Sequence, residues 1–93
     1  MIIDNPKDYK FIEFQEGKFP KKYVAILQNK KTNIIKKIPF GDQRYSQYKD
    51  STGLNLYSHL DHLDKKRRAL YYARFGKDAP LYSPKYWSHR FLW

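Results

Sequence analysis

The sequence predicts an α+β fold: a β-hairpin, or a three-stranded antiparallel sheet if an earlier segment joins it, packed against two principal helices and one short helix. Two β-rich apolar runs flank a short polar connection. The segment from Asp61 to Gly76 is rich in cations and leucine and has acidic residues at its start. Ser83-Pro84 precedes the last aromatic stretch. At 93 residues the chain is one domain, with 21–93 as its basic α+β body and 1–20 as an N-terminal arm or extra strand.

The N-terminal residues divide into a loop and a strand candidate. Asp4, Asn5 and Pro6 predict a loop or arm over residues 1–8, because these residue types favour turns. Tyr9–Phe14 is rich in aromatic and β-branched residues and predicts a short strand.

Two apolar runs, Tyr23–Leu27 and Ile34–Phe40, predict a β-hairpin whose polar loop spans residues 29–32. Side chains alternate along a strand with period two, so one face of the second run is mostly apolar and Lys36 is its exception. The apolar residues of that face are Ile34, Ile38 and Phe40. Pro39 has no backbone N–H, so the strand ends there or lies at a sheet edge.

A short helix is predicted over Asp42–Lys49, with Asp42 as its N-cap. Tyr45 and Tyr48 are three residues apart, so they would share one face of that helix. Ser51, Thr52, Gly53 and Asn55 then predict a loop.

The first principal helix is predicted over Asp61–Phe75. Ser58 and Asp61 have the spacing of a capping box, and Gly76 is a suitable residue to end the helix. Acidic residues at its start and basic residues further along complement the helix dipole. The apolar residues expected to point inward are Leu60, Leu63, Leu70 and Phe75.

The second principal helix is predicted over Pro84–Leu92. Ser83 would be its N-cap and Pro84 its first residue, where a missing N–H costs nothing. Trp87 and Phe91 are four residues apart and should pack on the core together.

The chain carries 19 Lys and Arg against 9 Asp and Glu, a formal net charge of +10. Such an excess opposes compaction by self-repulsion and is typical of proteins that meet a polyanion or an acidic partner. Between Gly17 and Gly41 there are seven lysines and no acid. Lysines also protect exposed sheet edges, so edge protection and phosphate contact explain the hairpin equally well.

Cations and aromatic rings interleave most densely between Asp61 and Trp93. Four consecutive cations occupy positions 65–68. Such a run is common on a solvated helix face, and it can also act as a nuclear localisation signal. The candidate nucleic-acid-binding residues are Lys30, Lys31, Lys36, Lys37, Lys65, Lys66, Arg68, Arg74, Lys85 and Arg90. The candidate base-stacking residues, expected to be the most exposed rings of this region, are Tyr72 and Tyr82.

No catalytic constellation or metal site is predicted. His59, Asp61, His62 and Asp64 are potential ligands, but zinc requires a matched set, and the chain has no cysteine. The same residues would serve a metal-dependent nuclease, which stays a third alternative. With four glycines and no phosphate-binding loop, no cofactor is expected.

No segment has the ~20 apolar residues of a membrane span, and the N-terminus lacks the features of a signal peptide. We therefore expect the protein in the cytoplasm or nucleus, or inside a particle. Nothing in the sequence predicts its oligomeric state.

Several motifs resemble a family of small basic proteins encoded by nucleocytoplasmic large DNA viruses. The resemblance covers residues 21–93, in the order KKYVAIL, TNIIKKIPFGD, RYSQY, YSHLDHLDKKRRALYYARFG and SPKYWSHRFLW. Its most specific parts are Phe40-Gly41 with Tyr45 and Tyr48, the spacing of His62, Asp64, Arg67, Arg68, Tyr71 and Arg74, and the closing Trp87-Ser88-His89-Arg90 with Leu92-Trp93. It implies a viral protein packaged in the virion and carries no mechanism.

The sequence thus predicts a non-enzymatic protein that binds nucleic acid, duplex DNA before RNA, through the backbone and with little base specificity. The alternative is a minor structural or capsid-assembly protein whose cations meet acidic protein surfaces.

Overall fold

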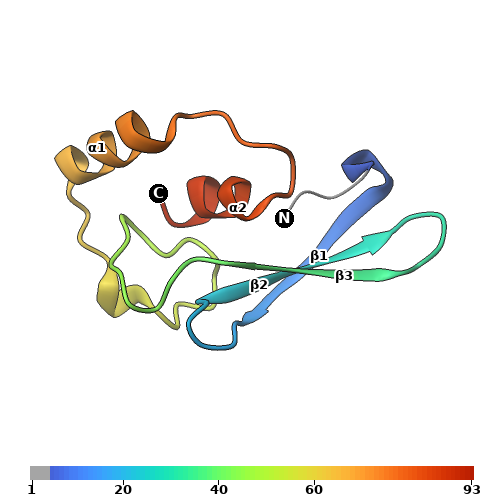
Figure 1. Ribbon diagram of the computed structural model, residues 1–93. Helices are drawn as coiled ribbons and strands as arrows, with labels where there is room; N and C mark the ends of the chain where they lie inside the picture. Colours follow the sequence, from blue (N-terminus) through green and yellow to red (C-terminus); the bar gives the residue numbers. More distant parts are fainter. Residues whose placement is uncertain (1–4) are drawn as a thin grey trace.

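The computed structural model describes residues 5–93 and contains a three-stranded antiparallel sheet with its helices on one side (Figure 1). The strands are β1 (Tyr9–Glu16), β2 (Tyr23–Asn29) and β3 (Ile35–Phe40), in the spatial order β1-β2-β3. The helices are α1 (Lys65–Phe75) and α2 (Pro84–Phe91), with 3-10 turns at Pro6–Asp8 and Ser58–Leu60. The α+β prediction is confirmed.

Strand pairing fixes which residues face the helices. β2 pairs with β3 in a register that places Tyr23 opposite Phe40 and Ala25 opposite Ile38. The register between β1 and β2 shifts between Phe11 and Glu13, a bulge that leaves Ile12 without a partner. The hairpin and the third strand are therefore confirmed. Of the loop predicted over residues 1–8, residues 1–4 lie outside the described residues, and a 3-10 turn occupies Pro6–Asp8.

The core lies between the sheet and α2. Its buried residues come from all three strands and from the end of the chain: Tyr9, Phe14, Tyr23, Ala25, Leu27, Ile38, Phe40, Trp87 and Leu92. Trp87 packs edge-on against Phe14, with ring centroids 5.6 Å apart, and its centroid lies 5.7 Å from that of Phe91. The predicted joint packing of Trp87 and Phe91 is confirmed. Ile34, predicted to share the inward face of β3, precedes that strand and is exposed.

α2 begins as predicted. Ser83 accepts a hydrogen bond from the backbone N–H of Tyr86, and Pro84 occupies the first turn. The predicted start of α1 is wrong. The helix begins at Lys65, where Asp64 caps it by accepting from the N–H groups of Lys66 and Arg67. Gly76 ends α1 at φ 74°, as predicted.

The predicted capping box fails because its acidic member has another role. The Asp61 carboxylate accepts hydrogen bonds from Gln47 Nε2 at 2.6 Å and from the Asp50 N–H at 2.8 Å. The hydroxyl of Ser58 donates to the carbonyl of Asn55. Residues 58–61 therefore anchor a loop, and the α-helix starts one turn later.

The short helix predicted over Asp42–Lys49 is wrong as well. This segment is an irregular loop in which Gln47, fully buried, forms a bridge to Asp61. Lys22 Nζ donates to Gln47 Oε1, and Gln47 Nε2 donates to the carbonyl of Tyr57 at 2.7 Å. These bonds require an extended path that a helix over 42–49 would not provide.

A buried hydroxyl–carboxylate pair fixes the rest of this loop. Tyr23 on β2 donates its hydroxyl to Asp50, and the same hydroxyl accepts from the Leu56 N–H at 3.0 Å. Asp50 also accepts from the hydroxyl of Thr52 and the N–H of Tyr57. Residues 42–61, which contain little regular structure, are thus held against the sheet by polar contacts.

α1 packs less deeply than predicted, because none of its residues is buried. Three of the four apolar residues expected to point inward are exposed, namely Leu63, Leu70 and Phe75. The inner side of α1 is instead aromatic. Tyr71 stacks on Trp93 with ring centroids 4.3 Å apart and an interplanar angle of 4°.

Candidate nucleic-acid interface

The positive charge of the chain is mostly unmatched by its own carboxylates. All 19 Lys and Arg fall within residues 5–93, and two of them form ion pairs there. Lys31 lies 3.8 Å from Asp8 at the surface. Arg44 pairs with Asp42 at 2.7 Å, and its hydrogen bonds lower the pKa of that carboxyl to about 2. One cation is unavailable, because Lys22 is buried under Gln47.

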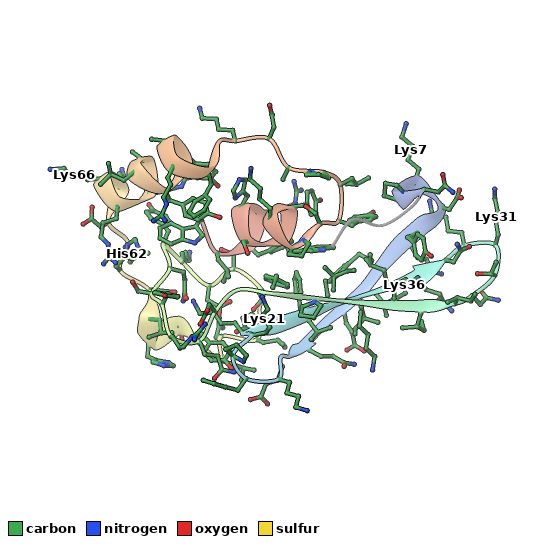
Figure 2. All side chains as sticks on the ribbon, viewed as in Figure 1. Lys7, Lys21, Lys31, Lys36, His62 and Lys66 are labelled. Carbon is green, nitrogen blue, oxygen red and sulfur yellow. The ribbon has the colours of Figure 1, made fainter. Side chains whose placement is uncertain are left out.

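The ten predicted contact residues form two groups rather than one patch. The molecule extends 42 × 26 × 19 Å, and Figure 2 shows Lys31 at the hairpin end and Lys66 at the α1 end. The hairpin group consists of Lys30, Lys31, Lys36 and Lys37, all exposed. Because Lys36 and Lys37 are adjacent on β3, their side chains point to opposite faces of the sheet.

Of the second group, Lys65, Arg68 and Arg90 line a groove between α1 and α2. The groove has a volume of about 750 Å³, and its walls come from α1, the loop after it and α2. Its cationic and aromatic lining residues are Lys65, Arg68, Tyr72, Lys77, Tyr86 and Arg90. Asp78 is the one carboxylate among the lining residues, so the groove is strongly basic. Below we call it the α1–α2 groove.

Arg68 is held in place by several contacts. Its Nε donates to the main-chain oxygen of Trp93, the last residue of the sequence, at 2.6 Å. Its guanidinium carbon lies 5.1 Å from the ring centroid of Tyr48 and 5.7 Å from that of Tyr72, as in cation–π pairs. The guanidinium is thereby held between the end of α2 and two aromatic rings, and no Asp or Glu side chain of residues 5–93 forms an ion pair with it.

His89 connects the two walls of the groove. Its Nδ1 lies 2.9 Å from the hydroxyl of Tyr71, and its Nε2 lies 2.9 Å from the carbonyl of Gly76. Tyr72 donates its hydroxyl to the carbonyl of His89 at 2.9 Å. Burial lowers the pKa of His89; the hydrogen bond to Gly76 opposes this and the charge of Lys85 adds to it, so the neutral imidazole is favoured. A neutral ring donates from Nε2 and accepts at Nδ1, which satisfies both contacts.

The predicted stacking residues, Tyr72 and Tyr82, are half-buried rather than well exposed. Tyr72 lines the groove, whereas the ring of Tyr82 lies parallel to that of Trp87, at 8° and 5.5 Å. Tyr45, at 66% exposure, is more open than either.

The remaining predicted residues do not line the groove. Lys66 and Arg74 lie on exposed parts of α1, and Lys85 on α2 is half-buried. Lys77 and Tyr86 were not among the predicted residues. Both lie in the segment where cations and rings interleave, but their place in the groove depends on how the loop after α1 crosses to α2.

Three of the four His and Asp residues considered for catalysis already have structural partners. Asp61 binds Gln47, Asp64 caps α1, and His62 Nδ1 accepts from the Asp64 N–H at 3.0 Å. Burial, with the nearby charge of Arg67, lowers the pKa of His62. Within residues 5–93 there is no group of three or more His, Asp or Glu that could hold a metal ion.

Comparisons with protein families, with curated proteins and with solved structures yield no match, so the interface rests on geometry and charge alone. In the described part of the chain, no helix has the length and apolar character needed to cross a bilayer.

Proposed function

We propose that this protein binds nucleic acid through the phosphate backbone, with little base specificity and without catalysis. The observation that carries the proposal is the excess of cations: within residues 5–93, two of 19 form an ion pair with an Asp or Glu side chain. Binding by such groups releases counterions from the nucleic acid, and this release supplies most of the free energy of non-specific association.

The spacing of the two cationic groups fits an extended partner. A molecule 42 Å long spans about 12 base pairs of duplex, at ~3.4 Å per phosphate along each strand. Duplex DNA lying along this axis would meet the hairpin lysines of one sheet face at one end and the cations of α1 at the other. Backbone contacts of this kind position a protein without reading sequence.

The test is equilibrium binding, followed by fluorescence anisotropy, to two labelled 20-base-pair duplexes of unrelated sequence at 0.1 M salt. We expect both dissociation constants to lie between about 10⁻⁶ and 10⁻⁴ M and to agree within about threefold. A large preference for one duplex would contradict backbone binding. The absence of binding to both would contradict the proposal itself.

A second candidate is a structural or assembly protein that binds an acidic protein surface. It is favoured by the exposed apolar side chains near the cations of α1, namely Leu63, Leu70 and Phe75, since apolar anchors are typical of protein interfaces. Cross-linking and pull-down from the native source, with and without nuclease treatment, distinguishes the two. A partner protein retained after nuclease treatment supports assembly, whereas loss of all partners supports nucleic-acid binding.

The viral setting, with packaging in a virion, belongs to the same proposal and rests on the sequence resemblance alone. The nuclease alternative has a direct test, which is cleavage of a labelled duplex when Mg²⁺ or Mn²⁺ is added. Cleavage that His62→Ala abolishes would replace the proposed function.

A further inference from the structure

We propose that the α1–α2 groove is a binding site for a single-stranded segment of nucleic acid, DNA or RNA. This inference rests on the proposed nucleic-acid binding and goes beyond it. It adds a role in binding unpaired strands for this one part of the surface, while a duplex contacts the hairpin lysines and the cations on the rim of the groove.

The charge of the groove selects an anion. Lys65 and Arg68 lie on α1, Lys77 on the following loop and Arg90 on α2, so cations approach from three elements. A single carboxylate, Asp78, lies among them. Like charges around one concave surface repel each other, and a bound anion offsets this repulsion. The concave shape also concentrates their electric field.

The size of the groove selects a single strand. A volume of about 750 Å³ is within the ~300–1,000 Å³ typical of sites for small ligands. A duplex is a rigid rod whose bases are paired inside, so it can touch the rims of such a groove but cannot enter it. A single strand can bend into the groove and present both a phosphate and an unstacked base.

The aromatic lining suits unstacked bases. Tyr72 and Tyr86 both line the groove, and each ring is held by neighbours. Tyr72 is fixed through its hydroxyl to the carbonyl of His89, and Tyr86 packs edge-on against Trp87 with centroids 5.0 Å apart. Phosphate-binding cations beside aromatic rings are the combination that single-strand-binding proteins use. An acidic peptide would use the cations but would not need the rings.

The groove is also preorganised. The contacts of His89 with Tyr71 and Gly76 connect α2 to both the middle and the end of α1. The walls are therefore held apart at a fixed separation before a ligand arrives. A preformed site loses less conformational entropy on binding, which favours affinity.

The test compares two variants of the full chain that lose the same charge. The groove variant is Lys65→Gln/Lys77→Gln/Arg90→Gln, and the hairpin variant is Lys30→Gln/Lys31→Gln/Lys37→Gln. All six residues are exposed, and circular dichroism checks that both variants fold. The probes are a 12-nucleotide oligo-dT, the matching oligo-U, a 12-base-pair duplex and a 12-residue poly-glutamate.

We expect the groove variant to lose about 100-fold in single-strand affinity at 0.1 M salt, relative to wild type. Each phosphate contact to a single strand contributes ~0.7 to the slope of log K against log salt concentration. Three lost contacts therefore lower log K by about 2 over the tenfold range from 1 M, where the contacts contribute little, to 0.1 M salt. The hairpin variant should lose less than about tenfold on single strands, and the two variants should lose equally on the duplex. The oligo-dT and oligo-U arms distinguish DNA from RNA.

Equal single-strand losses in the two variants, with wild-type binding intact, would overturn the groove assignment and leave the proposed function standing. Failure of the wild type to bind any nucleic acid would overturn both. Groove-dependent binding of poly-glutamate without oligo-dT or oligo-U binding would assign the groove to a protein. As a second readout, photo-cross-links from oligo-dT should fall on Tyr72 or Tyr86. Cross-links confined to the hairpin would contradict the inference.

Discussion

Replacing Tyr23 by phenylalanine should destabilise the protein far more than the loss of one oxygen atom suggests. The hydroxyl is buried, donates to the Asp50 carboxylate and accepts from the Leu56 N–H at 3.0 Å. It is thus one of the contacts that hold the loop of residues 42–61 to β2.

The magnitude follows from the two lost contacts. A hydrogen bond to a charged group contributes about 1.5–3 kcal/mol, and one between neutral groups about 1 kcal/mol. We therefore expect Tyr23→Phe to lower the free energy of unfolding by about 2–4 kcal/mol, out of a total of about 5–15 kcal/mol. For a domain of this size the corresponding fall in Tm is about 10–30 °C.

The assay is urea unfolding followed by tryptophan fluorescence and far-UV circular dichroism. Tyr45→Phe is the matched control, because the Tyr45 side chain is 66% exposed and should change stability by less than ~0.5 kcal/mol. If Tyr23→Phe also stays within ~0.5 kcal/mol of wild type, the buried hydroxyl does not hold the loop.

Two further predictions concern stability. Burial lowers the pKa of Lys22 to about 8, so between about pH 8 and 10 the unfolded chain binds more protons and the free energy of unfolding should rise with pH. Burial also raises the pKa of Tyr23 to about 12, so stability should fall again above about pH 10. Urea midpoints at pH 7.5, 9.5 and 11 check this, and Lys22→Met should lose the first rise. A rise of equal size in Lys22→Met would show that net charge is the cause. Separately, Gly41→Ala should cost more stability than Gly53→Ala: both glycines have positive φ, but a Cβ at Gly41 would lie 3.0 Å from Leu92 Cδ1, and one at Gly53 would meet open space. Equal losses of stability would contradict the close approach.

Local sequence signals predicted the elements that depend on neighbours in the chain. The alternation in β3, the apolar run of β2 and the Ser-Pro start of α2 were sufficient for three elements. The strand at Tyr9–Glu16 extends the one predicted over Tyr9–Phe14. In each case the local preference agrees with the tertiary contacts, so nothing overrides it.

Prediction failed where distant residues decide the local conformation. The capping signal at Ser58 and the cap at Asp42 are ordinary, but Gln47 and Asp61 bind each other and hold both segments out of a helix. Sequence patterns do not show which polar residues will be buried together. The same limit applies to the binding site. The cationic residues Lys65, Arg68 and Arg90 were predicted individually, whereas the groove depends on the path of the chain between α1 and α2.

The most direct measurement is the salt dependence of binding to duplex DNA, plotted as log K against log salt concentration between about 0.05 and 0.3 M. Binding by the unpaired cations predicts a straight line with a slope of about −4 or steeper, which corresponds to at least four or five phosphate contacts at ~0.9 each. A slope near zero would contradict the claim that the excess positive charge of this chain serves to bind a polyanion.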